Sequence, residues 1–221
     1  MSIIYKTTLT PTKLELLSGW LPSRPWYRPG GGAPALVKAG GFRLDDPDGA
    51  VGIELMAVTD TAGAQPVAYH VPLTYRGTPL DGADGALVGT TEHGVLGTRW
   101  VYDGTRDPVF VEQIVALIQG TAEPQAQSQN DTPDLTVRTR AASATMLEPG
   151  GFSVADGSDG TRLTIDAGDA GQLSVLVLRV LDAELDPDAP AVGSGLGYVT
   201  ALWQSPDSGL ARSVFATAER G

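Results

Sequence analysis

The sequence predicts an α+β fold: an antiparallel sheet with a short N-terminal helix and one closing helix, followed by a small, mostly β second domain. The 28 Gly and 16 Pro residues favour many turns and short strands over long helices. Short alternating apolar segments, bounded by turn residues, recur along the whole chain. The clearest helical periodicity follows Asp107, and 42% apolar residues suffice to bury a core.

The first segment predicts a strand followed by a helix. Residues 3–8 have the character of a short strand. Thr12 and Glu15 have the spacing of a capping box, in which each side chain satisfies a backbone amide of the other residue. We therefore expect a short helix through Leu14 and Leu17, which ends before the Pro-rich and Gly-rich residues 22–32.

The next segment predicts an antiparallel sheet. Residues 36–44 and 51–58 read as two strands of a hairpin, because the Asp, Pro and Gly residues between them supply turn dihedrals. The same alternation predicts further strands at residues 67–75, 86–91 and 97–102.

The closing helix has clear start and stop signals. Asp107 is a carboxylate N-cap, and Pro108 suits the first helical position. Phe110 and Ile114 begin an apolar stripe on one face, and Gly120 is a natural C-terminal stop.

A change of composition predicts a domain boundary after this helix. Residues 121–134 hold Gln, Ser, Asn, Pro and acidic residues with almost nothing apolar, which is typical of a flexible linker. We therefore expect a first domain at residues 1–120 and a small β-rich domain at residues 135–221. Its expected strands are residues 135–140, 163–165, 173–181, 198–204 and 211–216.

The charge balance and the absence of cysteine exclude several classes of function. With 15 basic and 26 acidic side chains the net charge is −11, which repels nucleic acid and anionic membrane surfaces. No Cys is present, so neither disulfides nor a Cys-type zinc site is expected. The first residues show no signal-peptide pattern, and no apolar run is long enough to span a bilayer. We expect a cytoplasmic protein with no membrane or nucleic acid partner.

Three short segments carry a resemblance to a known family. Residues 16–27 read LLSGWLPSRPWY, residues 69–75 read YHVPLTY, and residues 103–107 read DGTRD. In order and spacing they resemble the N-terminal cap domain of actinobacterial maltokinases and glucosamine kinases. The resemblance extends over residues 1–120.

The resemblance implies a relationship to sugar kinases without their catalytic residues. In the family the cap precedes a kinase domain that phosphorylates maltose or glucosamine with ATP and magnesium. The His-Gly-Asp catalytic loop of that domain has no counterpart, since His93 and Gly94 continue to Val95 and His70 continues to Val71. We expect a stand-alone cap form that lacks the catalytic lobe, with no catalytic residue, metal ligand or cofactor.

The second domain resembles a degenerate kinase small lobe. Residues 176–181 are similar to the strand that carries the ATP-contacting lysine, and Arg179 stands at the place of that lysine. An arginine can contact phosphate as a cation. Candidate ligand-binding residues are therefore Arg179 and the glycines Gly193, Gly195 and Gly197. The glycine spacing differs from a dinucleotide-binding loop, so a flexible turn is the alternative interpretation.

Two further clusters have both a functional and a structural interpretation. Trp20, Trp26 and Tyr27 are candidates for an interaction surface or a sugar platform, although aromatic residues beside an amphipathic helix more often pack into a core. The aspartates of residues 45–48 resemble a calcium loop, but a hairpin turn explains them better because the later ligand positions are missing.

These expectations lead to three hypotheses about function. The first is a non-catalytic accessory or regulatory protein that contacts a sugar kinase or another enzyme of glucan, trehalose or aminosugar metabolism; the resemblance alone implies this partner. The second is a sensor that binds a sugar or nucleotide without turnover. The third is one half of a split sugar kinase.

Overall fold

The computed structural model describes residues 8–129, 131–141, 150–183 and 195–221. The helices in this part of the chain are α1 (Lys13–Trp20) and α2 (Pro108–Ile118), with 3-10 turns at η1 (Leu21–Ser23), η2 (Asp84–Ala86), η3 (Gly104–Arg106) and η4 (Gly168–Ala170). The strands before α2 are β1 (Leu9–Thr10), β2 (Leu36–Leu44), β3 (Gly52–Asp60), β4 (Val67–Arg76), β5 (Leu87–His93) and β6 (Gly97–Asp103). The strands after α2 are β7 (Gln125–Ala126), β8 (Arg138–Ala141), β9 (Phe152–Asp156), β10 (Gly160–Asp166), β11 (Gln172–Leu178), β12 (Gly197–Ser205) and β13 (Gly209–Arg220).

Both α-helices begin at the predicted caps. The amide of Glu15 donates to the Thr12 hydroxyl over 3.3 Å, and the Thr12 amide donates to the Glu15 carboxylate over 2.7 Å. At α2 the Asp107 carboxylate accepts from the Val109 amide over 3.0 Å. Gly120 has φ of +75°, a left-handed conformation that glycine adopts without steric cost. The local start and stop signals of these helices are confirmed.

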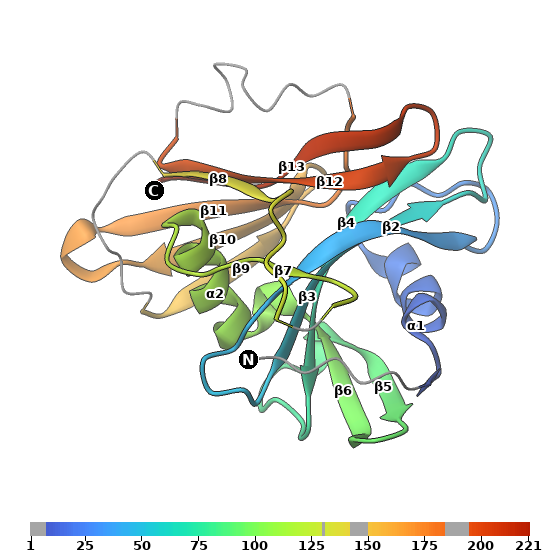
Figure 1. Ribbon diagram of the computed structural model, residues 1–221, viewed down its shortest axis with the longest axis horizontal. Coiled ribbons are helices and arrows are strands. Elements are labelled where there is room, and N and C mark those ends of the chain that lie inside the picture. Colours follow the sequence, from blue (N-terminus) through green and yellow to red (C-terminus); the bar gives the residue numbers. More distant parts are fainter. Residues whose placement is uncertain (1–7, 130, 142–149, 184–194) are drawn as a thin grey trace.

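The strands form one antiparallel sheet (Figure 1). Its strand order is β1-β5-β6-β4-β3-β2-β12-β13-β11-β10-β9, with β7 added beside β2 and β8 beside β12. The predicted α+β fold with an antiparallel sheet is confirmed. Three strands were not predicted: β1 and β7 have only two residues each, and β9 lies between Gly-rich turns. The predicted strand at residues 3–8 falls almost entirely outside the described residues.

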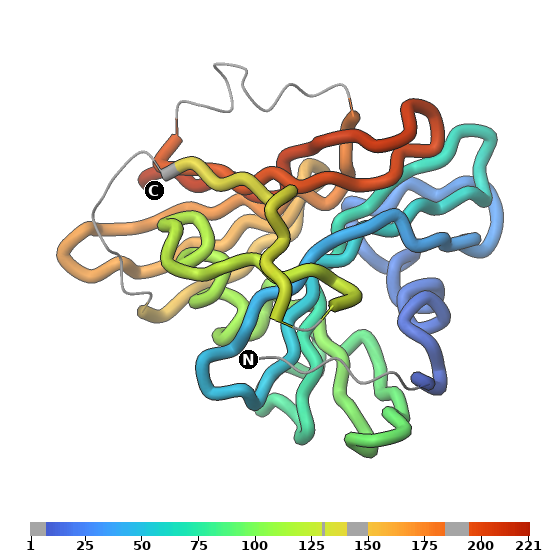
Figure 2. The backbone as a smooth tube through the Cα atoms, viewed as in Figure 1, coloured from blue at the N-terminus to red at the C-terminus, as the bar shows by residue number. Residues whose placement is uncertain are grey.

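A pairing between distant segments closes this sheet into a ring. β6 pairs with β4 only at residues 73–76, so the first half of β4 has a free edge. Tyr69 forms an antiparallel bridge with Val180, and the His70 amide donates to the Arg179 carbonyl over 2.9 Å. Because β12 also contacts β2, the continuous path β4-β3-β2-β12-β13-β11 returns to β4. In Figure 2 the path passes from the blue strand β2 to the red strands β12 and β13 and then to the orange strand β11.

Two cores lie on opposite faces of the first strands. Along β3, Leu55 and Ala57 face the larger core, which contains α2 and much of β10 to β13, whereas Met56 and Val58 face a smaller core with α1. This alternation follows from the two-residue period of a strand. The larger core contains Phe42 from β2 and Phe215 from β13, whose ring centroids are 6.0 Å apart.

Segments on both sides of the predicted domain boundary therefore share one sheet and one core. Within the predicted linker, β7 pairs with β2, and the side-chain amide of Gln127 donates to Glu54 over 2.7 Å. That part of residues 121–134 is therefore hydrogen-bonded to strands that precede α2. The division into domains at residues 1–120 and 135–221 stays a prediction about how the chain folds.

Candidate functional site

Arg179 occupies the junction between the first segment and the strands that follow α2. Its side chain has no exposed surface. The Nη2 atom donates to both Asp103 oxygens over 2.7 Å and to the Thr105 hydroxyl over 3.0 Å. The Nε atom donates to the Thr161 hydroxyl over 2.8 Å. The pairing that closes the strands into a ring places Arg179 here. Arg179 follows β11, and its backbone carbonyl accepts from the His70 amide of β4.

An aromatic ring covers the same guanidinium group. The Arg179 Cζ atom lies 4.9 Å from the centroid of the Trp26 ring, within the range of a cation–π interaction. Trp26 in turn contacts Trp20 and Tyr69, with centroid distances of 5.8 Å and 5.9 Å. The arginine is thus enclosed by a carboxylate, two hydroxyls and an indole.

A second ion pair lies beside the first one. The Arg106 guanidinium donates to Asp156 over 2.7 Å, and Asp156 also accepts from the Thr161 hydroxyl over 2.7 Å. Burial opposes ionisation of Asp156, but the hydrogen bonds from Thr161 and Arg106 outweigh it, so the pKa of this carboxyl lies below its usual value. Thr161 of β10 therefore links the two ion pairs, which join the segment around η3 to β9 and to the chain that follows β11.

His70 borders this cluster as a neutral core residue. Burial, helped by the nearby charge of Arg179, lowers the pKa of His70 to about 3. Its Nδ1 atom lies 3.0 Å from the Leu178 carbonyl oxygen. A carbonyl oxygen only accepts, so Nδ1 carries the proton of the neutral ring. The ring packs against Phe215 at a centroid distance of 4.4 Å.

A separate polar cluster surrounds Glu54, on the same face of β3 as Met56 and Val58. This carboxylate accepts from Lys13 Nζ over 2.5 Å, from the Tyr75 hydroxyl over 2.6 Å and from Gln127 over 2.7 Å. Burial raises the pKa of Glu54, but the charge and hydrogen bond of Lys13 reverse that effect and leave the pKa below its usual value. The cluster ties α1, β3, β4 and the segment after β7 together.

Trp26 and Asp103 of the Arg179 cluster fall in a stretch that matches a known family model. Residues 20–107 match the family model of the maltokinase N-terminal cap domain. The predicted resemblance is confirmed over this stretch, which we call the cap segment. It contains Trp26 and Asp103, whereas Arg179 lies outside it. A comparison with curated protein sequences finds no match.

The cap segment brings its three aromatic residues together, but largely inside the protein. Trp20 is 7% exposed and Trp26 is 2% exposed, so both rings are core residues and the core interpretation is confirmed. They do not form the exposed surface that the sequence left open, because they pack in the smaller core with Leu17 of α1 and Tyr69 of β4. Tyr27 is partly exposed; burial and a hydrogen bond to Asp60 over 2.8 Å raise its pKa to about 12.

The candidate ligand-binding residues within the described part of the chain have structural roles of their own. Gly193 lies outside the described residues. A side chain on Gly195 would collide with the Ala218 carbonyl oxygen. The close approach of these two backbone segments therefore explains why a glycine stands at this position. Gly197 begins β12 and pairs with Ala218. The hydrogen-bond partners of Arg179 in the described part of the chain include none of these glycines.

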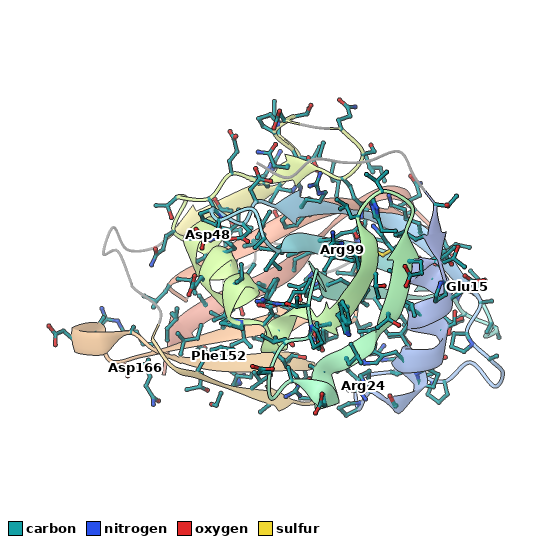
Figure 3. All side chains as sticks on the ribbon, turned by 90° about the horizontal axis from the view of Figure 1, so that it is seen from below. Glu15, Arg24, Asp48, Arg99, Phe152 and Asp166 are labelled. Atoms are coloured by element: carbon teal, nitrogen blue, oxygen red, sulfur yellow. The ribbon has the colours of Figure 1, made fainter. Side chains whose placement is uncertain are left out.

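The aspartates that resembled a calcium loop form a hairpin turn. The Asp46 carboxylate accepts from the backbone amides of Asp48, Ala50 and Val51 over 2.8 to 3.1 Å. In the same way Asp166, labelled in Figure 3 at the end of the β10–β11 hairpin, accepts from the Gly168 amide over 2.9 Å. Among the described residues no group of three or more His, Asp or Glu is placed to hold a metal ion.

Sequence reasoning missed the two acidic partners of this cluster as site residues. Asp103 opens the DGTRD motif that supported the family resemblance, so it had a sequence signal without a role. Asp156 had no signal, because a single aspartate at the end of an unpredicted strand has no distinctive spacing.

Neither α1 nor α2, the α-helices of the described residues, has the length and apolar character needed to cross a membrane.

Proposed function

We propose that this chain is a non-catalytic accessory or regulatory protein, related to the cap of sugar kinases, which acts in the cytoplasm. Its proposed partner is a sugar kinase or another enzyme of glucan, trehalose or aminosugar metabolism. One observation carries the proposal. Arg179, at the place that the resemblance gives to a phosphate-contacting lysine, is buried and bound to Asp103 of the cap segment.

The chemistry of phosphoryl transfer supports this proposal. The reaction needs a cationic group on the phosphates of ATP together with carboxylates that hold magnesium. Here the Nη2 and Nε atoms of Arg179 are used by Asp103, Thr105 and Thr161. The Nη1 atom has no hydrogen-bond partner among the described residues but is buried. A phosphate would therefore have to enter the protein interior beside Asp103 to reach it, and burying its charge there costs free energy. Arg179 is therefore better suited to joining two parts of the protein than to binding a nucleotide.

A surface away from this cluster has the apolar character that partner contact requires. Leu135 is 89% exposed and Leu210 is 67% exposed. Arg212 Nη1 donates to the Thr136 carbonyl over 2.7 Å, which places the chain beside Leu135 near β13. Leu210 lies two residues before Arg212 on β13 and so on the same face. We propose that this surface, around Leu135 and Leu210, contacts the partner enzyme.

The test uses the purified chain and a purified maltokinase from the same organism. We expect a complex in sedimentation velocity and a change in kinase kcat or KM when the chain is added. Leu210→Glu should weaken the complex at least tenfold, whereas Val95→Glu, at another exposed apolar position, should leave it unchanged. If a panel of kinases and glucan enzymes shows neither complex nor altered turnover, the proposal fails.

A parallel measurement separates the proposal from its alternatives. A ligand that binds the native state raises the Tm of a protein by mass action. If the chain binds none of them, millimolar ATP with magnesium, maltose and glucosamine should each leave its Tm unchanged. A saturable rise in Tm with any of them would favour the sensor hypothesis. Phosphorylation of maltose or glucosamine only after mixing with a separately produced kinase lobe would instead favour a split enzyme.

A further inference from the structure

The turn between β5 and β6 is held by a histidine side chain. His93 and Gly97 form the last pair of this hairpin, so residues 94–96 make the turn. The His93 Nδ1 atom lies 3.3 Å from the Val95 amide nitrogen and 3.1 Å from the Leu96 amide nitrogen. Gly97 has φ of +71°, the left-handed residue that commonly follows a three-residue hairpin turn.

These two contacts determine the protonation state of His93. Both backbone N–H groups donate, so Nδ1 must be the unprotonated nitrogen and the proton of the neutral ring lies on Nε2. The ring then acts as an aspartate or asparagine side chain does when it accepts from amides two and three residues ahead. Protonation would add a hydrogen to Nδ1, directed at two donors, and both hydrogen bonds would be lost.

The same turn presents apolar side chains to solvent. Val95 is 59% exposed and Leu96 is 42% exposed. The Leu96 carbonyl accepts from Arg99 Nη2 over 2.9 Å, so Arg99 holds the turn from β6. Arg99, a residue of β6, is labelled in Figure 3. We infer that His93 is a pH-operated clasp, which fixes the exposed Val95–Leu96 turn when neutral and releases it when protonated.

The charges around His93 favour its neutral form near pH 7. Partial burial is the main cause that lowers the pKa of His93, and the positive charges of Arg99 and Lys13 add to it. Glu92 precedes His93 on β5 and accepts from the Thr98 hydroxyl over 2.7 Å. Because the pKa in the folded protein lies below the usual value near 6.5, the clasp is closed above that value. It is lost as the pH falls through the folded pKa. The clasp does not depend on the proposed partner.

The experiment compares the full chain with two variants by NMR. His93→Asn places an amide oxygen near the position of Nδ1 and keeps the acceptor but cannot titrate. His93→Ala removes the acceptor. The measurements are the ring ¹⁵N shifts of His93, which report the tautomer, and the amide shifts of Val95 and Leu96 between pH 8 and pH 4.

The clasp predicts one pattern across the three proteins. In the wild type His93 should be the Nε2–H tautomer at pH 7, and the Val95 and Leu96 amides should titrate with its pKa. In His93→Asn these amides should keep their pH 8 shifts down to about pH 5, and in His93→Ala they should have open-turn shifts throughout. An Nδ1–H tautomer at pH 7, or amide shifts that ignore the His93 titration, would overturn the inference.

Discussion

At the scale of single residues, the structure concentrates unusual electrostatics where Arg179 meets Asp103. The two side chains are 0% and 2% exposed, and both carboxylate oxygens are bonded to the arginine. Taking both charges out of water costs free energy, so the pair is no proof of stability by itself. Removing one partner is different, because the other charge then stays buried without compensation.

We predict that Asp103→Ala lowers the free energy of unfolding by about 3–5 kcal/mol. The double variant Asp103→Leu with Arg179→Met should lose much less, since it removes both charges and keeps apolar volume. Urea denaturation at pH 7 measures all three proteins. Glu219→Gln, at the pair Arg162–Glu219 whose side chains are 45% and 61% exposed, is the matched control and should change stability by less than about 1 kcal/mol.

His70 predicts how stability depends on pH. Its pKa is about 3 in the folded protein and near 6.5 when unfolded, so the unfolded chain takes up the proton first as the pH falls. Stability from the neutral ring is complete above the unfolded value and declines below it. Between pH 6 and pH 5 the wild type should lose about 1 kcal/mol more than His70→Leu. Equal losses in urea titrations at the two pH values would contradict the buried neutral histidine.

At the scale of elements, α2 depends on one aspartate with two roles. Asp107 caps the helix through the Val109 amide and forms two hydrogen bonds with Arg76, of 2.7 Å and 2.6 Å. Its side chain is 0% exposed, whereas that of Arg76 is 19% exposed. The cap is local, but the ion pair fixes the start of α2 against the end of β4.

Two substitutions at this position separate the roles. Asp107→Asn keeps a capping oxygen and removes the charge, whereas Asp107→Ala removes both. We predict that Asp107→Ala is less stable than Asp107→Asn by about 1 kcal/mol, the usual contribution of an N-cap. Chemical denaturation followed by circular dichroism measures the difference. Two variants of equal stability would mean that the cap contributes nothing beyond the ion pair.

At the scale of the whole molecule, the predicted domains have the contacts of one cooperative unit. Phe215 of β13 contacts both Phe42 and His70 of the first segment, with centroid distances of 6.0 Å and 4.4 Å. The Tyr69–Val180 bridge closes the ring between the same parts. Neither part can unfold alone without exposing the apolar core that it shares with the other part to water.

We therefore predict a single unfolding transition for segments on both sides of residues 121–134. Hydrogen exchange followed by mass spectrometry at increasing urea should give the same midpoint for peptides of β3 and β13. Two separated midpoints, with β13 opening first, would instead support two domains that fold independently. The measurement thus decides the predicted boundary directly.

Local features of this protein are determined by its sequence. The capping box at Thr12, the N-cap at Asp107 and the turn at Asp46 depend on side chains that satisfy amides within a few residues. Strand periodicity likewise depends on neighbours, so most strands and the antiparallel sheet could be predicted. The cap motifs are contiguous and were recognised for the same reason.

Only the tertiary structure decided what the candidate site residues do. Arg179 and Asp103 are 76 residues apart, and nothing near either residue specifies that they meet. Their contact depends on the pairing of β4 with the chain after β11, which is set by the register of the strands and by the two cores. Burial then converts Arg179 from an expected phosphate contact into an ion-pair partner, and Trp20 and Trp26 into core residues. The burial of each of these residues depends on how the whole chain packs, so local sequence patterns could not predict it.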